Sequence, residues 1–141
     1  MNRKKILLMA NDVTLAHLGR PLQLAAGLVA DGHAVTLAAS ADSAPFLKNF
    51  PGRLITLAPT GKARFIENLA KGRPVFDYPT LQRYTEEDEA ILASERPDLV
   101  IGDFRITLSI SARRQQIPYA TLTNAYWSPA FSPRFIVPDL P

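Results

Sequence analysis

The stretch KILLMANDVTLAHLGRPLQLAAGLVADGHAVTLAAS, residues 5–40, decides the fold because it predicts a strand, a helix and a second strand. Residues 5–10 form a nearly continuous apolar run, which is typical of a strand buried on both faces. Pro21 suits the first turn of the helix that follows, and Gly32 is well placed to end it. Residues 34–39 indicate the next strand, so the stretch predicts one βαβ unit.

The rest of the chain continues this alternation of short apolar strands and helices. Further strands are predicted at 53–58, within 96–103 and at 117–124, and helices at 43–50, from Thr80 to about Ser94 and at 105–116. Residues 59–78 are assigned no more than one or two helical turns. The predicted fold class is α/β: a Rossmann-like parallel sheet of order 3-2-1-4-5 with helices on both faces.

Composition narrows the class of protein. The chain has 141 residues, of which 47% are hydrophobic and 21% charged, so one globular domain is expected. Its net charge of +3 is spread along the chain, so we expect no nucleic-acid partner and at most weak attraction to membrane surfaces. It has no cysteine, which excludes disulfides and thiolate metal sites. The first apolar run is too short for a signal peptide, and we expect a cytoplasmic protein.

Two polar residues are predicted to meet at one edge of this sheet. His17 lies in the loop expected after the first strand, and Asp103 ends the fourth strand. In the order 3-2-1-4-5 these strands are neighbours, and ligands of open parallel sheets bind beyond their carboxyl ends. A carboxylate that holds one imidazole nitrogen leaves the other free to take a proton from a substrate hydroxyl. The pair therefore suggests group transfer to a hydroxyl.

Simpler interpretations of these residues stay open. A single loop histidine is more often a surface or capping residue, and Asp103 alone could cap a helix that begins near Arg105. His33 follows Gly32 at the opposite edge of the sheet and is interpreted as structural. The sequence contains no glycine-rich phosphate loop, no HExxH metal motif and no GxSxG nucleophile elbow. No metal site and no bound cofactor are predicted.

Three stretches resemble the amino-terminal half of GT-B glycosyltransferases of the macrolide, sterol and plant secondary-metabolite type. They are KILLMA with AHLGRPLQLAAGLVADGHAVTLAAS, then RPDLVIGDFRITLSISARRQQIPYATLTNAYWSP, and the final VPDLP. Together they cover about half of the chain, whereas residues from about 59 to 90 match weakly. One departure is Ala16, which stands where the family usually has a glycine before the histidine.

The resemblance implies roles for individual residues. His17 would be the general base of an inverting sugar transfer, and Asp103 would orient it. The resemblance also implies that a nucleotide sugar is the co-substrate, held mainly by a second domain of comparable size. We expect residues 1–141 to be one acceptor-binding domain, itself incomplete, with that donor domain absent from this chain and little activity alone.

The acceptor is expected to touch loop residues around the dyad. A lipophilic or aromatic acceptor is expected, covered by the aromatic residues Tyr126, Trp127, Phe131 and Phe135. For each aromatic residue taken alone, ordinary packing is the alternative, and for Arg105 the alternative is a solvated helix residue. The predicted contacts are Asn11, Phe76, Tyr78, Arg105, Asn124, Tyr126 and Trp127.

Two other functions remain as alternatives. The chain could be a non-catalytic subunit that recruits a separate donor-binding subunit, with its apolar tail as the interface. It could also be a stand-alone Rossmann-like binding protein, although no phosphate-binding loop supports this. An unfinished edge of the sheet would allow pairing with a second copy. The sequence identifies neither the acceptor nor the sugar.

Overall fold

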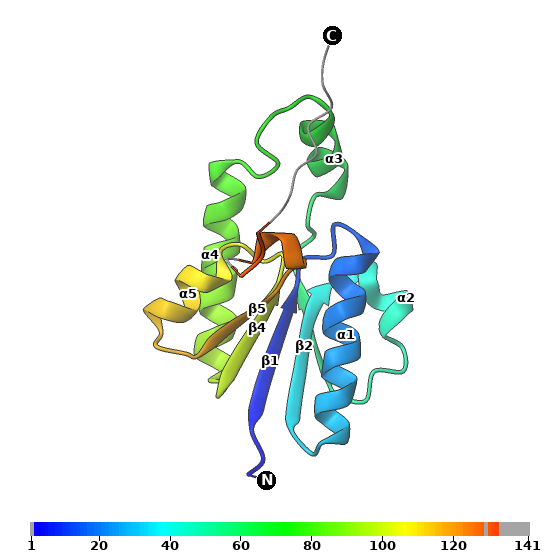
Figure 1. Cartoon of the computed structure of the whole chain (residues 1–141), viewed down its shortest axis with the longest axis vertical. Helices are drawn as coiled ribbons and strands as arrows, with labels where there is room; N and C mark the ends of the chain where they lie inside the picture. Colours follow the sequence, from blue (N-terminus) through cyan, green and yellow to red (C-terminus); the bar gives the residue numbers. More distant parts are fainter. Residues whose placement is uncertain (1, 129, 133–141) are drawn as a thin grey trace.

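The computed structural model describes residues 2–128 and 130–132, so the predictions for Phe135 and VPDLP lie outside the described residues. It contains a five-stranded parallel sheet of order β3-β2-β1-β4-β5 (Figure 1). The predicted strand order is therefore confirmed. The strands are β1 (Lys5–Ala10), β2 (Ala34–Ser40), β3 (Arg53–Leu57), β4 (Leu99–Asp103) and β5 (Tyr119–Leu122).

Helices cover both faces of the sheet, as expected for this fold class. Cluster residues from α1 and α2 pack on one face, and residues from α4 and α5 pack on the other (Figure 1). Helix α3 lies beyond the carboxyl edge of the sheet, in the region that the sequence left almost unassigned. The α-helices are α1 (Leu15–Ala30), α2 (Ala44–Leu47), α3 (Lys62–Ala70), α4 (Tyr78–Glu95) and α5 (Leu108–Arg114), with short 3₁₀ helices η1 (Ala41–Ser43) and η2 (Ala125–Trp127).

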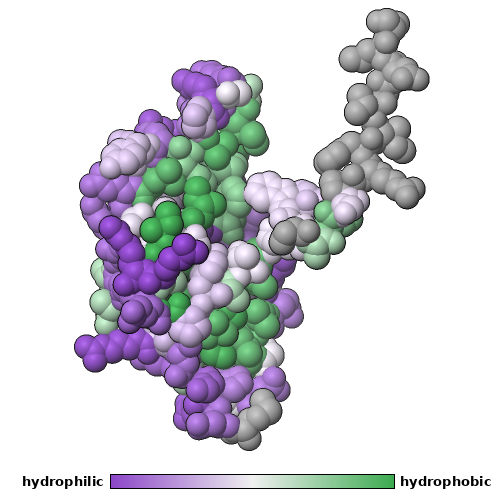
Figure 2. All heavy atoms as spheres, turned by 60° about the vertical axis from the view of Figure 1, so that its left-hand side comes forward, coloured by the Kyte–Doolittle hydropathy of each residue, from purple (hydrophilic) through white to green (hydrophobic). Residues whose placement is uncertain are grey.

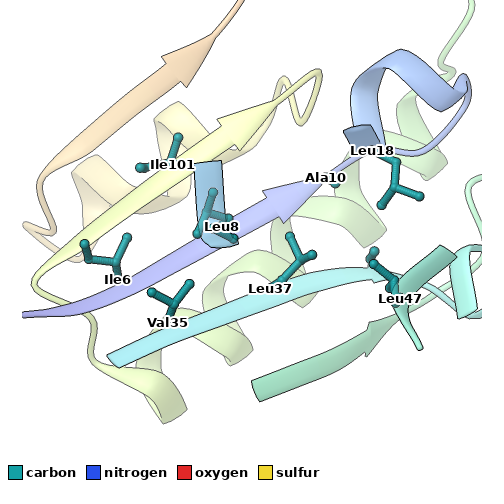
Figure 3. Close-up of a cluster of buried hydrophobic side chains, with 10 residues drawn as sticks. Ile6, Leu8, Ala10, Leu18, Val35, Leu37, Leu47 and Ile101 are labelled. Carbon is teal, nitrogen blue, oxygen red and sulfur yellow. The ribbon is translucent and has the colours of Figure 1, made fainter. Parts of the chain in front are cut away.

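The unalternating run of β1 is explained by burial on both of its sides. Ile6 and Leu8 of β1 pack with Leu37 of β2 and Leu18 of α1 in one buried hydrophobic cluster (Figure 3). Leu7 and Met9 point the other way, toward the residues of α4 and α5. Because β1 is the central strand, both of its faces need apolar side chains.

The start of α1 differs from the prediction. Helix α1 begins at Leu15, so His17 stands in its first turn rather than in a loop, and Pro21 lies inside the helix. Leu18 is 2% exposed and packs in the core. The buried face of the helix thus extends back past the proline, and packing outweighs the preference of proline for a first turn.

Other predicted boundaries shift by a few residues. Helix α4 begins at Tyr78, and its N-cap Asp77 accepts a hydrogen bond from the backbone N–H of Thr80 at 3.0 Å. Helix α5 begins at Leu108, three residues later than predicted, and a turn with a hydrogen bond from the Leu108 N–H to the Arg105 carbonyl, at 3.1 Å, precedes it. Strand β5 ends at Leu122, two residues before the predicted end.

Candidate active site

The carboxyl ends of β1 and β4 bring the two predicted dyad residues together. Ala10 pairs with Asp103, and the backbone N–H of Asn11 donates to the Asp103 carbonyl at 3.0 Å. The first turn of α1 then carries His17 over this edge, where its Nδ1 lies 2.8 Å from Asp103 Oδ1. Asp103 is fully buried and the His17 side chain is 18% exposed, so the imidazole remains partly accessible.

The tautomer of His17 can be inferred from its neighbours. An ionised carboxylate only accepts hydrogen bonds, so the 2.8 Å contact requires the proton on Nδ1. Arg20 Nη2 also lies 3.0 Å from Nδ1, but it donates to the same Asp103 oxygen at 2.8 Å. The Nδ1–H tautomer leaves the lone pair on Nε2, which is the nitrogen that a base would use.

Phe104 is a site residue that sequence reasoning missed. Its ring stacks on the His17 imidazole, with centroids 4.5 Å apart and planes 9° from parallel. The left-handed backbone of Phe104, uncommon outside glycine, turns the chain directly after Asp103. Phe65 and Phe76 stand behind it, each with its ring centroid 5.9 Å from that of Phe104. The stack fixes the plane of the imidazole.

A cavity of about 470 Å³ opens beside the dyad. Tyr126 and Trp127 of η2 form part of its wall, with 58% and 67% of each residue exposed. Asn124 lines it too and donates from Nδ2 to the Tyr126 hydroxyl at 2.7 Å. The lining combines polar side chains with the rings of Tyr126 and Trp127, which form the aromatic wall of the cavity. The predicted site residues in the lining are His17, Asp103, Arg105, Asn124, Tyr126 and Trp127.

Three other predicted contacts do not line this cavity. Asn11 is fully buried, and Phe76 packs between the rings of Phe65, Tyr84 and Phe104. Tyr78 lines a separate groove of about 420 Å³ with Leu81 of α4 and Ile110 of α5. Figure 2 brings this side of the molecule forward and shows hydrophobic residues exposed among hydrophilic ones.

Arg105 is neither solvated nor helical, so the alternative interpretation given above is wrong. It is 2% exposed and precedes α5. Its Nε donates to Asp88 at 2.7 Å and its Nη2 to Glu87 at 2.6 Å, while its guanidinium carbon lies 4.1 Å from the Tyr84 ring centroid. Burial raises the pKa of Asp88, and the Arg105 charge opposes that rise. The Nε and Nη2 groups of Arg105 are therefore bonded to α4.

Two kinds of site are absent from the described residues. Within 2–128 and 130–132, no three histidine, aspartate or glutamate side chains gather as a metal site would require. None of the helices in the same residues is both long enough and apolar enough to cross a membrane.

The fold and the site together define a class: a Rossmann-like domain with a His–Asp pair on a ligand-sized cavity at the carboxyl edge of its sheet. No family model matches the chain. It is 41% identical over 138 residues to a PGL/p-HBAD biosynthesis rhamnosyltransferase of Mycobacterium bovis, covering 98% of this chain and 30% of that protein. It is 38% identical over 141 residues to an inactive PGL/p-HBAD biosynthesis glycosyltransferase of the same species, covering 99% and 38%.

Solved structures agree on the fold. The spinosyn forosaminyltransferase SpnP superposes with a TM-score of 0.63 at 16% identity, over 85% of this chain and 31% of that one. Identity this low supports the fold alone. The chain thus spans about a third of the length of the glycosyltransferases it matches in sequence. The resemblance to glycosyltransferases is thus confirmed in sequence, and the solved structures share the fold of this chain over part of their length.

Proposed function

We propose that this chain is the acceptor-binding half of a glycosyltransferase, with His17 as the base that activates the acceptor hydroxyl. One observation carries the proposal. His17 Nδ1 is held 2.8 Å from a fully buried Asp103 on the wall of a cavity. The similarity in sequence to a rhamnosyltransferase supports the same reaction class.

The proposed reaction follows from the tautomer. The acceptor hydroxyl donates to Nε2 of His17, and its proton passes to that nitrogen as its oxygen attacks the anomeric carbon of a nucleotide sugar. The bond from that carbon to the diphosphate breaks as the new glycosidic bond forms, and the configuration inverts. Asp103 stabilises the imidazolium that results, as carboxylates do for catalytic histidines. The nucleoside diphosphate leaves with the electron pair.

The cavity wall suggests the class of acceptor. Tyr126 and Trp127 present two aromatic rings, with centroids 6.3 Å apart, to the space beside the dyad. Aromatic side chains bind flat apolar or aromatic groups well and keep a polar edge available. We propose an aromatic or lipophilic molecule with one free hydroxyl. Relatives of the chain are named as glycosyltransferases of PGL/p-HBAD biosynthesis, so the acceptors of that biosynthesis are candidate acceptors for this protein.

The donor half is proposed to lie outside these residues. The chain covers only 30–38% of its relatives, so a further domain or a separate subunit would hold the nucleotide sugar. A second candidate function is a non-catalytic partner subunit. A relative that is named inactive favours this alternative and makes a direct assay necessary.

Transferase assays on the complete gene product test the proposal. The enzyme is incubated with nucleotide sugars and hydroxylated aromatic acceptors, and products are measured by mass spectrometry. His17→Ala is expected to lower kcat by about 10²- to 10⁴-fold, the usual scale for a lost general base. His33→Ala is the matched control, because the His33 side chain lies at the other edge of the sheet, where it accepts a hydrogen bond from the Lys4 backbone. Full activity of His17→Ala would refute the role of His17.

A further inference from the structure

Arg20 connects the dyad to the aromatic wall of the cavity. It lies three residues after His17 in α1, so the two side chains share one face of the helix. Its Nε donates to Asp103 Oδ2 and its Nη2 to Asp103 Oδ1, each at 2.8 Å. Its Nη1 donates to Asn124 Oδ1 at 2.8 Å, and Asn124 donates in turn to the Tyr126 hydroxyl.

These contacts occupy all three guanidinium nitrogens with protein acceptors. Two parallel bonds to one carboxylate fix its rotation as well as its position, which a lysine ammonium cannot do. The orientation matters because Asp103 Oδ1 must face Nδ1 of His17. A guanidinium that is held in this way is suited to ordering its neighbours rather than to capturing a substrate anion.

The hydrogen bond from Arg20 to Asn124 indicates a second structural role for Arg20. The residues after β5 run along the cavity and carry Tyr126 and Trp127 in η2. The Arg20–Asn124 contact joins residues 104 positions apart in the sequence. Without it, the described side-chain hydrogen bonds would no longer link the aromatic wall to the dyad.

We propose that Arg20 is a positioning residue that orients Asp103 toward His17 and docks the segment 124–127 beside it. The proposal rests on the function proposed above. Its consequence is that acceptor binding and base orientation share one chain of contacts, from Tyr126 through Asn124, Arg20 and Asp103 to His17. Loss of Arg20 then affects both binding and turnover, whereas a substrate contact would affect the binding of its own substrate alone.

The test measures kcat and both KM values in the complete gene product. Arg20→Ala is expected to lower kcat by about 10- to 100-fold, the scale on which a misplaced group slows a reaction, and to raise the acceptor KM while the donor KM stays within about twofold. Added guanidinium at a non-denaturing concentration is expected to restore part of the kcat of Arg20→Ala and none of that of His17→Ala. Arg113→Ala, an exposed arginine on α5, is the matched control.

Two further variants separate positioning from folding and binding. Arg20→Lys keeps a charge and is expected to fold, yet to recover little kcat because it lacks the two-point contact. The double variant Arg20→Ala/Asn124→Ala is expected to raise the acceptor KM by less than the product of the two single-variant effects, since the Arg20–Asn124 contact is lost in both single variants.

The outcomes distinguish this proposal from the one on which it rests. Wild-type kinetics in Arg20→Ala, alongside an impaired His17→Ala, would overturn the role of Arg20 and leave the base intact. A rise confined to the donor KM would mean that Arg20 binds the nucleotide sugar directly, which also overturns it. Full activity of His17→Ala would instead refute the proposed function, and the positioning role with it.

Discussion

Replacing Arg105 with methionine removes the cation at the centre of a buried network between α4 and the loop before α5. The guanidinium donates to Asp88, to Glu87 and to the Tyr84 carbonyl at 2.7, 2.6 and 3.3 Å. Asp88 is fully buried and accepts hydrogen bonds from Arg105 and from the Thr107 hydroxyl, the latter at 2.6 Å. Of these two donors, the variant keeps only Thr107. Breaking a buried ion pair from one side costs about 3–5 kcal/mol of unfolding free energy.

The penalty is expected to depend on pH. Burial already raises the pKa of Asp88 above its ordinary value of 3.8, and Arg105 opposes that rise. A carboxyl with a raised folded-state pKa contributes most below its unfolded value, and that contribution is lost as the pH rises through the folded value. Arg105→Met raises the folded pKa of Asp88 further, so the loss of stability should be larger at neutral pH than in acid.

Urea unfolding followed by circular dichroism measures the loss of unfolding free energy. In a thermal scan of a chain of this size, a loss of about 3–5 kcal/mol corresponds to a fall in Tm of about 6–20 °C. Arg113→Met, at an exposed site on α5, should change stability by less than about 0.5 kcal/mol. The double variant Arg105→Met/Asp88→Leu removes both charges and should lose much less than Arg105→Met. A loss below about 1 kcal/mol in Arg105→Met would refute the reasoning about this network.

Further predictions concern the cavity and its dyad. Phe104→Ala removes the ring stacked on His17 and should lower kcat by about 2- to 10-fold, the equivalent of about 0.5–1.5 kcal/mol, and an unchanged kcat would mean that the stack does not orient the base. Asp103→Asn should lower kcat by about 10²- to 10⁴-fold by favouring the wrong tautomer, and retained turnover would argue against a dyad. Trp127→Ala should weaken acceptor binding in a titration calorimeter, whereas Tyr78→Ala, in the other groove, should not. Equal effects of these two variants would move the acceptor away from the cavity.

The sequence predicted the central part of the fold because the local residue pattern there reflects burial in the core. An apolar run without alternation occurs in a strand that is buried on both faces, and β1 has Leu8 on one face and Leu7 on the other. The strand order then placed His17 and Asp103 at neighbouring strand ends, where the structure finds them in contact. Alternation of elements indicated the parallel sheet, and the Rossmann-like order expected for such a sheet placed these two strands side by side.

Other features depend on contacts that no local pattern records. The early start of α1 follows from the packing of Leu18 in the core, against the local preference of Pro21. The burial of Arg105 depends on carboxylates in α4, 17 and 18 residues away in the sequence. The left-handed backbone of Phe104 has no glycine or asparagine to signal it. Arg20 stands in the quoted stretch, but its partner Asn124 lies 104 residues later.

The tautomer of His17 tests the central claim most directly. The chain has two histidines, so long-range ¹H–¹⁵N spectra of the imidazole rings are readily assigned with a His17→Gln variant. At a pH where the ring is neutral, the account predicts that His17 carries its proton on Nδ1, and that Asp103→Asn changes this pattern while the His33 signals stay unaltered. A His17 ring protonated on Nε2 in the unaltered protein would contradict the account, because no lone pair would then be available to accept the acceptor proton.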